Sequence, residues 1–246
     1  MAWIPRFRRL LCAACVVLTP LVLSAAVLSL PPSPAAASPS GEHTWRVWIL
    51  GDSLTGGLYA SSEETTFRSQ LLGMLGASDP SRQIAPFWHR GCTLARLEMR
   101  WPEFSGRPDL LFLEYGINDL GNPGCPQIPE DQYAARFGAM LDRMLADAPG
   151  VEIVVGTIPW CGWAQGSAER DHALRYNAMI AGEAEKRGLI VSDLWSATVD
   201  HPENLSSPSE ASPFPPGYAG DGFHPSDQGH LAIAQAFFKA YSDHHQ

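Results

Sequence analysis

The residues best suited to chemistry in this 246-residue chain are a serine, an aspartate and a histidine in short glycine-containing blocks. Ser53 stands in a Gly-Asp-Ser-Leu block directly after an apolar run, and Asp221 precedes His224 by three residues in a Gly/Pro turn. A serine hydroxyl becomes a nucleophile when a base takes its proton, and a carboxylate that orients an imidazole makes it such a base. Each block alone is more typical of a helix cap or a surface turn than of a catalytic residue. The chemistry therefore requires a fold that brings them together.

Two further blocks could serve the same reaction. Asn118 lies in Gly-Ile-Asn-Asp, and Gly91 begins Gly-Cys-Thr; each block follows a predicted strand. An asparagine amide can donate a hydrogen bond to an oxyanion, which is worth about 3 kcal/mol of transition-state stabilisation. A glycine lets the backbone N–H approach a reacting carbonyl closely. Both residues are also common in plain turns.

The elements that must position these blocks alternate between strand and helix. The patterns predict strands at 45–50, 84–88, 110–115, 151–158 and 189–191, and helices at 65–75, 132–148, 169–187 and 228–241. This alternation predicts an α/β fold with a parallel sheet covered on both faces. Binding sites of such sheets lie at the carboxyl ends of the strands, where the blocks of Ser53, Gly91 and Asn118 fall. The block of Asp221 and His224 comes just before the last predicted helix. The Pro- and Ser-rich segment 198–220 is either a flap that faces the substrate or an exposed insertion.

The N-terminal segment has the pattern of an export signal. Three arginines precede residues 10–30, which carry no charge, and a run of alanines follows. The pattern indicates a secreted or cell-envelope protein, with a signal that is cleaved after Ala37 or Ala26, or one that stays as a membrane anchor. The predicted segments are the signal or anchor at 1–37, a linker at 38–43 and one catalytic domain at 44–246.

Composition excludes several classes of protein. Hydrophobic residues make up 45% of the chain and charged residues 17%, which is enough for a large core and excludes global disorder. The formal charge is −9, and the part after residue 37 keeps 14 basic against 26 acidic residues. Such an acidic domain repels phosphate backbones, so we expect no nucleic-acid partner.

The four blocks in this order resemble the GDSL, or SGNH, hydrolase family, and the likeness runs from Trp45 to about Tyr241. The resemblance implies a three-layer α/β/α, flavodoxin-like fold with five parallel strands in the order 2-1-3-4-5. It implies a carboxylic ester hydrolase that needs no metal and no organic cofactor.

The resemblance also implies a role for each block. Ser53 would attack the ester carbonyl, His224 would take its proton and Asp221 would orient His224. The backbone N–H groups of Ser53 and Gly91 and the side chain of Asn118 would hold the oxyanion.

The cysteines after the signal are Cys92, Cys125 and Cys161, and their spacing fits no zinc pattern. In an oxidising compartment they predict one disulfide and one free thiol. The strand order of the family makes the loops after the third and fourth strands neighbours, which implies a Cys125–Cys161 disulfide and a free Cys92.

Other residues near the blocks have less specific signals. Trp160 and Trp163 follow the fourth strand, where they either line an acyl or sugar pocket or pack in the core. Glu114 lies in an apolar strand and needs a partner such as an arginine. Asp52 and Asp119 are expected to make local hydrogen bonds rather than to act in catalysis.

The sequence thus predicts a secreted serine esterase whose substrate is an acetylated carbohydrate, a short-chain ester or an acyl lipid. Two alternatives remain open. One is an O-acyltransferase that acts on a glycan. The other is a non-catalytic carbohydrate- or wall-binding protein on the same scaffold.

Overall fold

The computed structural model of the chain describes residues 44–206, 211–213, 216–219 and 221–246. The chain separates into two units, Met1–Gly41 and Glu42–Gln246, and all described residues belong to the second. The predicted signal or anchor and most of the predicted linker lie outside the described residues. Within those residues, no helix combines the length and the apolar character needed to cross a bilayer.

Five parallel strands form the central sheet, in the order β2-β1-β3-β4-β5. The strands are β1 (Trp45–Gly51), β2 (Ile84–Arg90), β3 (Leu110–Glu114), β4 (Glu152–Gly156) and β5 (Ile190–Ser192). Every residue of β3 is buried, whereas β2 lies at one edge and is largely exposed. This difference explains why β3 is an unbroken apolar run up to its last residue.

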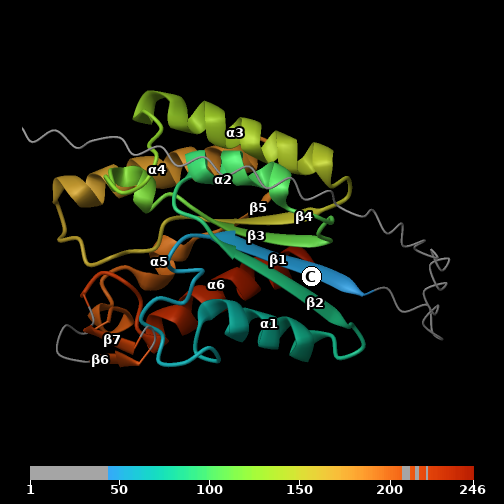
Figure 1. Cartoon of the computed structure of the whole chain (residues 1–246), viewed down its shortest axis with the longest axis horizontal. Coiled ribbons are helices and arrows are strands. Elements are labelled where there is room, and N and C mark those ends of the chain that lie inside the picture. The colour runs from blue at the N-terminus through green and yellow to red at the C-terminus, as the bar shows by residue number, and fades with distance from the viewer. Residues whose placement is uncertain (1–43, 207–210, 214–215, 220) are drawn as a thin grey trace, which may run out of the picture. The chain divides into compact units, whose positions relative to one another are not determined.

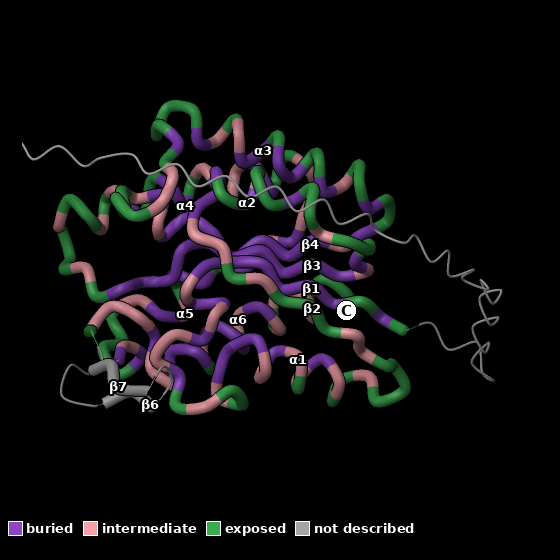
Figure 2. Tube along the Cα trace, viewed as in Figure 1, coloured by how far each residue is buried: buried purple, intermediate pink, exposed green. Residues whose placement is uncertain are grey.

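Helices cover both faces of the sheet (Figure 1). On one face lie α1 (Phe67–Ser78), α5 (Leu194–Thr198) and α6 (Asp227–His244), and on the other α2 (Leu94–Arg100), α3 (Glu130–Asp147) and α4 (Ala168–Glu185). Short 3-10 turns are η1 (Trp101–Glu103), η2 (Asn118–Leu120) and η3 (Pro202–Asn204). The buried residues follow the sheet and the inner sides of these helices (Figure 2).

Hydroxyl side chains begin several of the helices. Thr66, Thr93, Ser167 and Ser226 each accept a hydrogen bond from a backbone N–H in the first turn of the helix that follows. Such caps satisfy donors that a helix start leaves unpaired. Ser226 caps α6 two residues after His224, so this cap helps to fix the position at which the loop that carries His224 ends.

The predicted fold class and strand order are confirmed, and the predicted elements lie within a few residues of their observed bounds. Sequence reasoning missed α2, although Thr93 as a cap and the spacing of Leu94 and Leu97 were signals for it. It also described 198–220 as irregular, whereas this segment includes η3 and the antiparallel pair β6 (Ala211–Pro213) and β7 (Pro216–Ala219). The prediction that this segment is a flap stays a prediction, because residues 207–210, 214–215 and 220 lie outside the described ones.

Candidate active site

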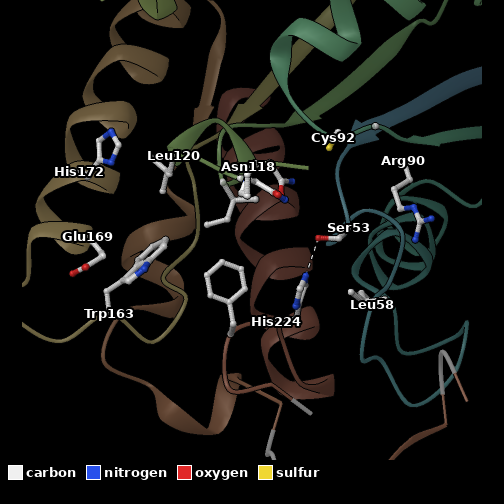
Figure 3. Close-up of a pocket in the computed structure, with 16 residues that line it drawn as sticks. Ser53, Leu58, Arg90, Cys92, Asn118, Leu120, Trp163, Glu169, His172 and His224 are labelled. Carbon is white, nitrogen blue, oxygen red and sulfur yellow. Dashed lines mark hydrogen bonds between the residues drawn. The ribbon is translucent and has the colours of Figure 1, made fainter. Parts of the chain in front are cut away.

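Ser53 lies at the carboxyl end of β1, where the chain leaves the sheet in a tight loop. The carbonyl of Asp52 accepts a hydrogen bond from the N–H of Gly56 at 3.0 Å, and the carbonyl of Ser53 accepts one from Leu58 at 3.1 Å. The Asp52 side chain accepts the N–H of Leu54 at 3.0 Å. These bonds close the loop around Ser53 and turn its side chain toward a cavity (Figure 3).

His224 completes a hydrogen-bond relay with Ser53 and Asp221. The Oγ of Ser53 lies 2.9 Å from Nε2 of His224, and Nδ1 of His224 lies 2.6 Å from Oδ2 of Asp221 (Figure 3 shows the first contact). Because a carboxylate only accepts hydrogen bonds, the histidine proton resides on Nδ1 and leaves Nε2 as an acceptor. In this arrangement Nε2 can take the proton of the Ser53 hydroxyl.

Asp221 is held in its ionised form. Burial raises the pKa of Asp221, but hydrogen bonds from the His224 backbone, the His224 ring and the Phe223 N–H outweigh it and bring the pKa below its usual value. Ser206 adds a hydroxyl bond to Oδ1 of Asp221 at 3.1 Å. Sequence reasoning missed Ser206, and no motif could have found it.

Asn118 lies at the start of η2, next to Ser53. Its Nδ2 donates to Oδ2 of Asp52 at 3.2 Å, and its Oδ1 accepts from Asn122 at 2.7 Å. These two bonds fix which end of the amide faces Asp52. An amide nitrogen carries two hydrogens, so the second remains available for an oxyanion. The preceding Gly116 has a φ of 132°, and a Cβ there would press on Ile158, so this approach requires glycine.

Gly91 lines the same cavity but presents no free donor to it. Its N–H donates to the carbonyl of Gly51 at 2.6 Å and thereby continues the ladder between β1 and β2. A Cβ at Gly91 would collide with the hydroxyl of Tyr115. The expectation that this N–H faces an oxyanion is therefore not met here. The glycine instead permits close packing against Tyr115.

The cavity in front of Ser53 has a volume of about 650 Å³. Ser53, Asn118 and His224 share it with apolar side chains, of which Leu58, Ile117, Leu120, Trp163 and Phe223 are the larger. Arg90 lies on one side of Ser53, and Glu169 and His172 lie at the opposite end, beyond Trp163 (Figure 3). The site thus combines an aromatic wall with polar groups at both ends.

The two tryptophans after β4 have different places. Trp163 lines the cavity, and its ring stacks on Trp195 with the centroids 6.1 Å apart. Trp160 is 8% exposed, belongs to a small buried cluster with Ala173 and Trp195, and donates its indole N–H to the carbonyl of Trp163. Of the two candidates, only Trp163 is a pocket residue; Trp160 supports it.

The predicted disulfide is wrong. Cys92 and Cys125 form the bond, with their Cα atoms 6.0 Å apart, and Cys161 is free and buried. The loop after η2 runs toward the end of β2 rather than toward β4, and the carbonyl of Pro126 in this loop accepts a hydrogen bond from Thr93 at 2.6 Å. The bond joins the segment of Gly91 to the loop that follows Asn118.

Three buried carboxyl groups lie behind Ser53 and Asn118. Burial raises the pKa values of Asp52 and Glu114, and the Asp52 charge raises that of Glu114 further. Burial also raises the pKa of Asp119 to about 7, although its carboxylate accepts the N–H of Leu94. Asp52 and Asp119 make the local hydrogen bonds expected of them. Glu114 contacts Thr55 and Asp52 rather than an arginine.

No cluster of three or more His, Cys, Asp or Glu residues in the described part of the chain is arranged to hold a metal ion.

Comparisons with known proteins show the family and the fold. The profile of the GDSL-like Lipase/Acylhydrolase family matches residues 49–232. No curated protein matches the chain in sequence.

Two solved structures are similar in fold. LAE5, an alpha/beta hydrolase enzyme from the metagenome of Lake Arreo in Spain, is 21% identical with a TM-score of 0.64, over 82% of this chain and 96% of that one. Axe2, an acetylxylan esterase from Geobacillus stearothermophilus, is 23% identical with a TM-score of 0.61, over 82% of this chain and 94% of that one. The family match spans most of the chain and includes Ser53, Asn118 and His224. The chain therefore belongs to the GDSL-like lipase/acylhydrolase family, whose members are carboxylic ester hydrolases.

Proposed function

We propose that the protein is an exported serine esterase in which Ser53, His224 and Asp221 form the catalytic triad. The observation that carries this proposal is the continuous relay from Ser53 Oγ through the imidazole to the Asp221 carboxylate, at 2.9 and 2.6 Å. The relay opens into a cavity large enough for a small ester. Export rests on the basic and apolar pattern of residues 1–37.

The reaction proceeds through an acyl-enzyme. His224 takes the proton of Ser53 as its oxygen attacks the ester carbonyl, and Asp221 stabilises the imidazolium that forms. The tetrahedral intermediate collapses when His224 returns that proton to the departing alcohol. Water then gives a proton to His224 as its oxygen attacks the acyl-enzyme. His224 returns this proton to the Ser53 oxygen as the acid leaves, which regenerates the hydroxyl.

We assign Asn118 as the main donor to the oxyanion. Its second amide hydrogen is not used by the bond to Asp52. The Ser53 N–H, which contacts Asp52, is the second donor once it turns from Asp52 to the oxyanion. The Gly91 N–H contributes only where its 2.6 Å bond to Gly51 is given up.

For the substrate we propose an acetylated carbohydrate. Trp163 offers an aromatic face to a sugar ring, and Asn122, Glu169 and His172 supply hydrogen-bonding groups on the same cavity. The acetylxylan esterase activity named for the structural neighbour Axe2 supports this choice. A lipid substrate would favour a more uniformly apolar cavity.

The test is hydrolysis of p-nitrophenyl acetate by the wild type and by Ser53→Ala. We expect Ser53→Ala to lose turnover without a change in thermal stability, whereas Ser196→Ala, an exposed serine that bonds Asp193, keeps both. Undiminished turnover by Ser53→Ala refutes the nucleophile. A non-catalytic binding protein would show no turnover in the wild type.

The substrate class is tested with acetylated xylan and with p-nitrophenyl esters of increasing chain length. We expect acetate to be released from xylan and turnover to decrease with acyl length. Increasing turnover with length would instead indicate an acyl lipid. Acetyl transfer to an added xylo-oligosaccharide in preference to water would indicate the acyltransferase.

A further inference from the structure

Asp52 and Glu114 form a buried acidic pair directly behind the candidate site. The register of β1 and β3 places Glu114 opposite Gly51, the residue before Asp52, and the side chains are 0% and 1% exposed. Their carboxyl groups hydrogen-bond to each other. In the described residues no basic side chain contacts either one. Two buried carboxylates without a cation cannot both be ionised, so the pair holds a proton.

The hydrogen bonds decide which carboxyl carries the proton. Asp52 accepts the N–H of Leu54 at 3.0 Å and Nδ2 of Asn118 at 3.2 Å. Asp52 also accepts the N–H of Ser53. Glu114 accepts the backbone N–H of Asp52 and the hydroxyl of Thr55, the latter at 3.4 Å, and its Oε1 has no partner. Donors stabilise an anion, so the negative charge belongs on Asp52 and the proton on Glu114.

Asn118 depends on this distribution of charge. Its amide is held by two contacts, Asp52 at Nδ2 and Asn122 at Oδ1. An ionised Asp52 is the stronger acceptor and keeps the nitrogen at the end of β1, beside Ser53. We propose that Glu114 is a positioning residue for the oxyanion site: its protonated carboxyl donates to Asp52, and the Asp52 anion then holds the Asn118 amide and the Leu54 backbone. This inference rests on the role proposed above for Asn118.

The surroundings of the pair support the assignment. Burial raises the pKa of Glu114 well above its usual value, and the charge of Asp52 raises it further. The other ionisable groups that interact with the pair are all neutral or acidic: Tyr115, Asp119, Tyr133 and Cys161. Burial raises the pKa of each of them. The guanidinium of Arg68 bonds the Thr55 carbonyl and Glu63 instead.

Two variants of Glu114 with side chains of similar volume distinguish a role in positioning Asn118 from a role in core packing. Glu114→Leu cannot donate to Asp52, whereas the carboxamide of Glu114→Gln can. We expect Glu114→Leu to lower kcat for p-nitrophenyl acetate by about tenfold with little change in KM, and Glu114→Gln to restore most of this loss. In an Asn118→Ala background Glu114→Leu should cost no further kcat, because its effect acts through that amide. Equal kcat for the Gln and Leu variants overturns the proposal. So does a tenfold decrease of kcat when Glu114→Leu is added to Asn118→Ala.

Infrared spectroscopy tests the proton without using activity. At about pH 8 Asp119, with a pKa of about 7, is mostly ionised, so the carbonyl band of a protonated acid should come chiefly from the pair. We expect this band in the wild type and its loss in Glu114→Gln. A wild type without the band overturns the proposal, even where Glu114→Leu fails to fold. If Ser53→Ala kept full activity, the function proposed above would be refuted. The carbonyl band would still show whether Glu114 is protonated, so the two failures can be distinguished.

Discussion

The Cys92–Cys125 disulfide allows a prediction whose magnitude follows from the structure. The bond closes a chain segment with a sequence separation of 33 residues. The entropy that such a loop removes from the unfolded chain corresponds to about 3.7 kcal/mol of stability at 25 °C. For a domain of this size 1 kcal/mol shifts Tm by about 2–4 °C, so removal of the bond should lower Tm by roughly 7–15 °C.

The perturbation is the double variant Cys92→Ser, Cys125→Ser, and the matched control is Cys161→Ser. Cys161 is buried and its thiol donates to the carbonyl of Pro159 at 3.5 Å, a bond that a serine hydroxyl can keep. In urea unfolding without reductant, only the double variant should lose the full amount, about 3.7 kcal/mol, of the free energy of unfolding. The wild type with reductant should be as unstable as the double variant. Since Cys92 lines the cavity, kcat/KM for p-nitrophenyl acetate should also decrease in the double variant.

Two results would refute this reasoning. One is a peptide map without reductant in which Cys161 is paired. The other is a greater loss of stability in Cys161→Ser than in the double variant.

Two further predictions concern Asn118 and His230. Asn118→Ala should lower kcat by about 10²-fold with KM nearly unchanged, while Asn122→Ala, which removes only the 2.7 Å bond to the Asn118 oxygen, should lower it less; equal kinetics in steady-state assays would exclude the oxyanion role. Burial lowers the pKa of His230 from 6.5 to about 4. Its neutral ring accepts the N–H of Phe67 and contacts the carbonyl of Leu58. The unfolded state therefore binds more protons between these pH values, and stability should decrease by up to about 3 kcal/mol as pH decreases from 6.5 to 4. When urea unfolding is measured at pH 6.5 and at pH 4, the free energy of unfolding of His230→Gln should decrease less than that of the wild type. An equal decrease in both proteins would contradict the lowered pKa of His230.

The sequence was sufficient for those parts of the fold and site that depend on local pattern. Alternation of apolar runs and helical spacing predicted the parallel sheet, because buried parallel strands need continuous apolar residues. The strand order was implied by the resemblance to the family. The blocks of Ser53, Asn118 and His224 could be recognised because each combines a reactive residue with turn-forming neighbours. The structure brings Ser53, His224 and Asp221 into one relay from segments as much as 171 residues apart.

Features that depend on the path of a loop or the direction of a side chain could not be predicted. The pairing of Cys92 depends on where the loop after η2 turns, and nothing in its spacing encodes that turn. Trp160 and Trp163 are three residues apart in a loop without periodicity, so only coordinates separate the buried ring from the partly buried one that lines the cavity. For Glu114 the sequence predicted a partner such as an arginine, whereas its partner is Asp52. Two buried acids can pair only by sharing a proton, and residue types do not reveal a shared proton.

The central claim is that Ser53 is the nucleophile activated by His224. Its most direct test is mass spectrometry of the protein after exposure to a fluorophosphonate, which labels an activated serine covalently. We predict one adduct, located on the peptide that contains Ser53 and absent from His224→Ala. An unlabelled Ser53, or a label of equal extent in His224→Ala, would contradict the account.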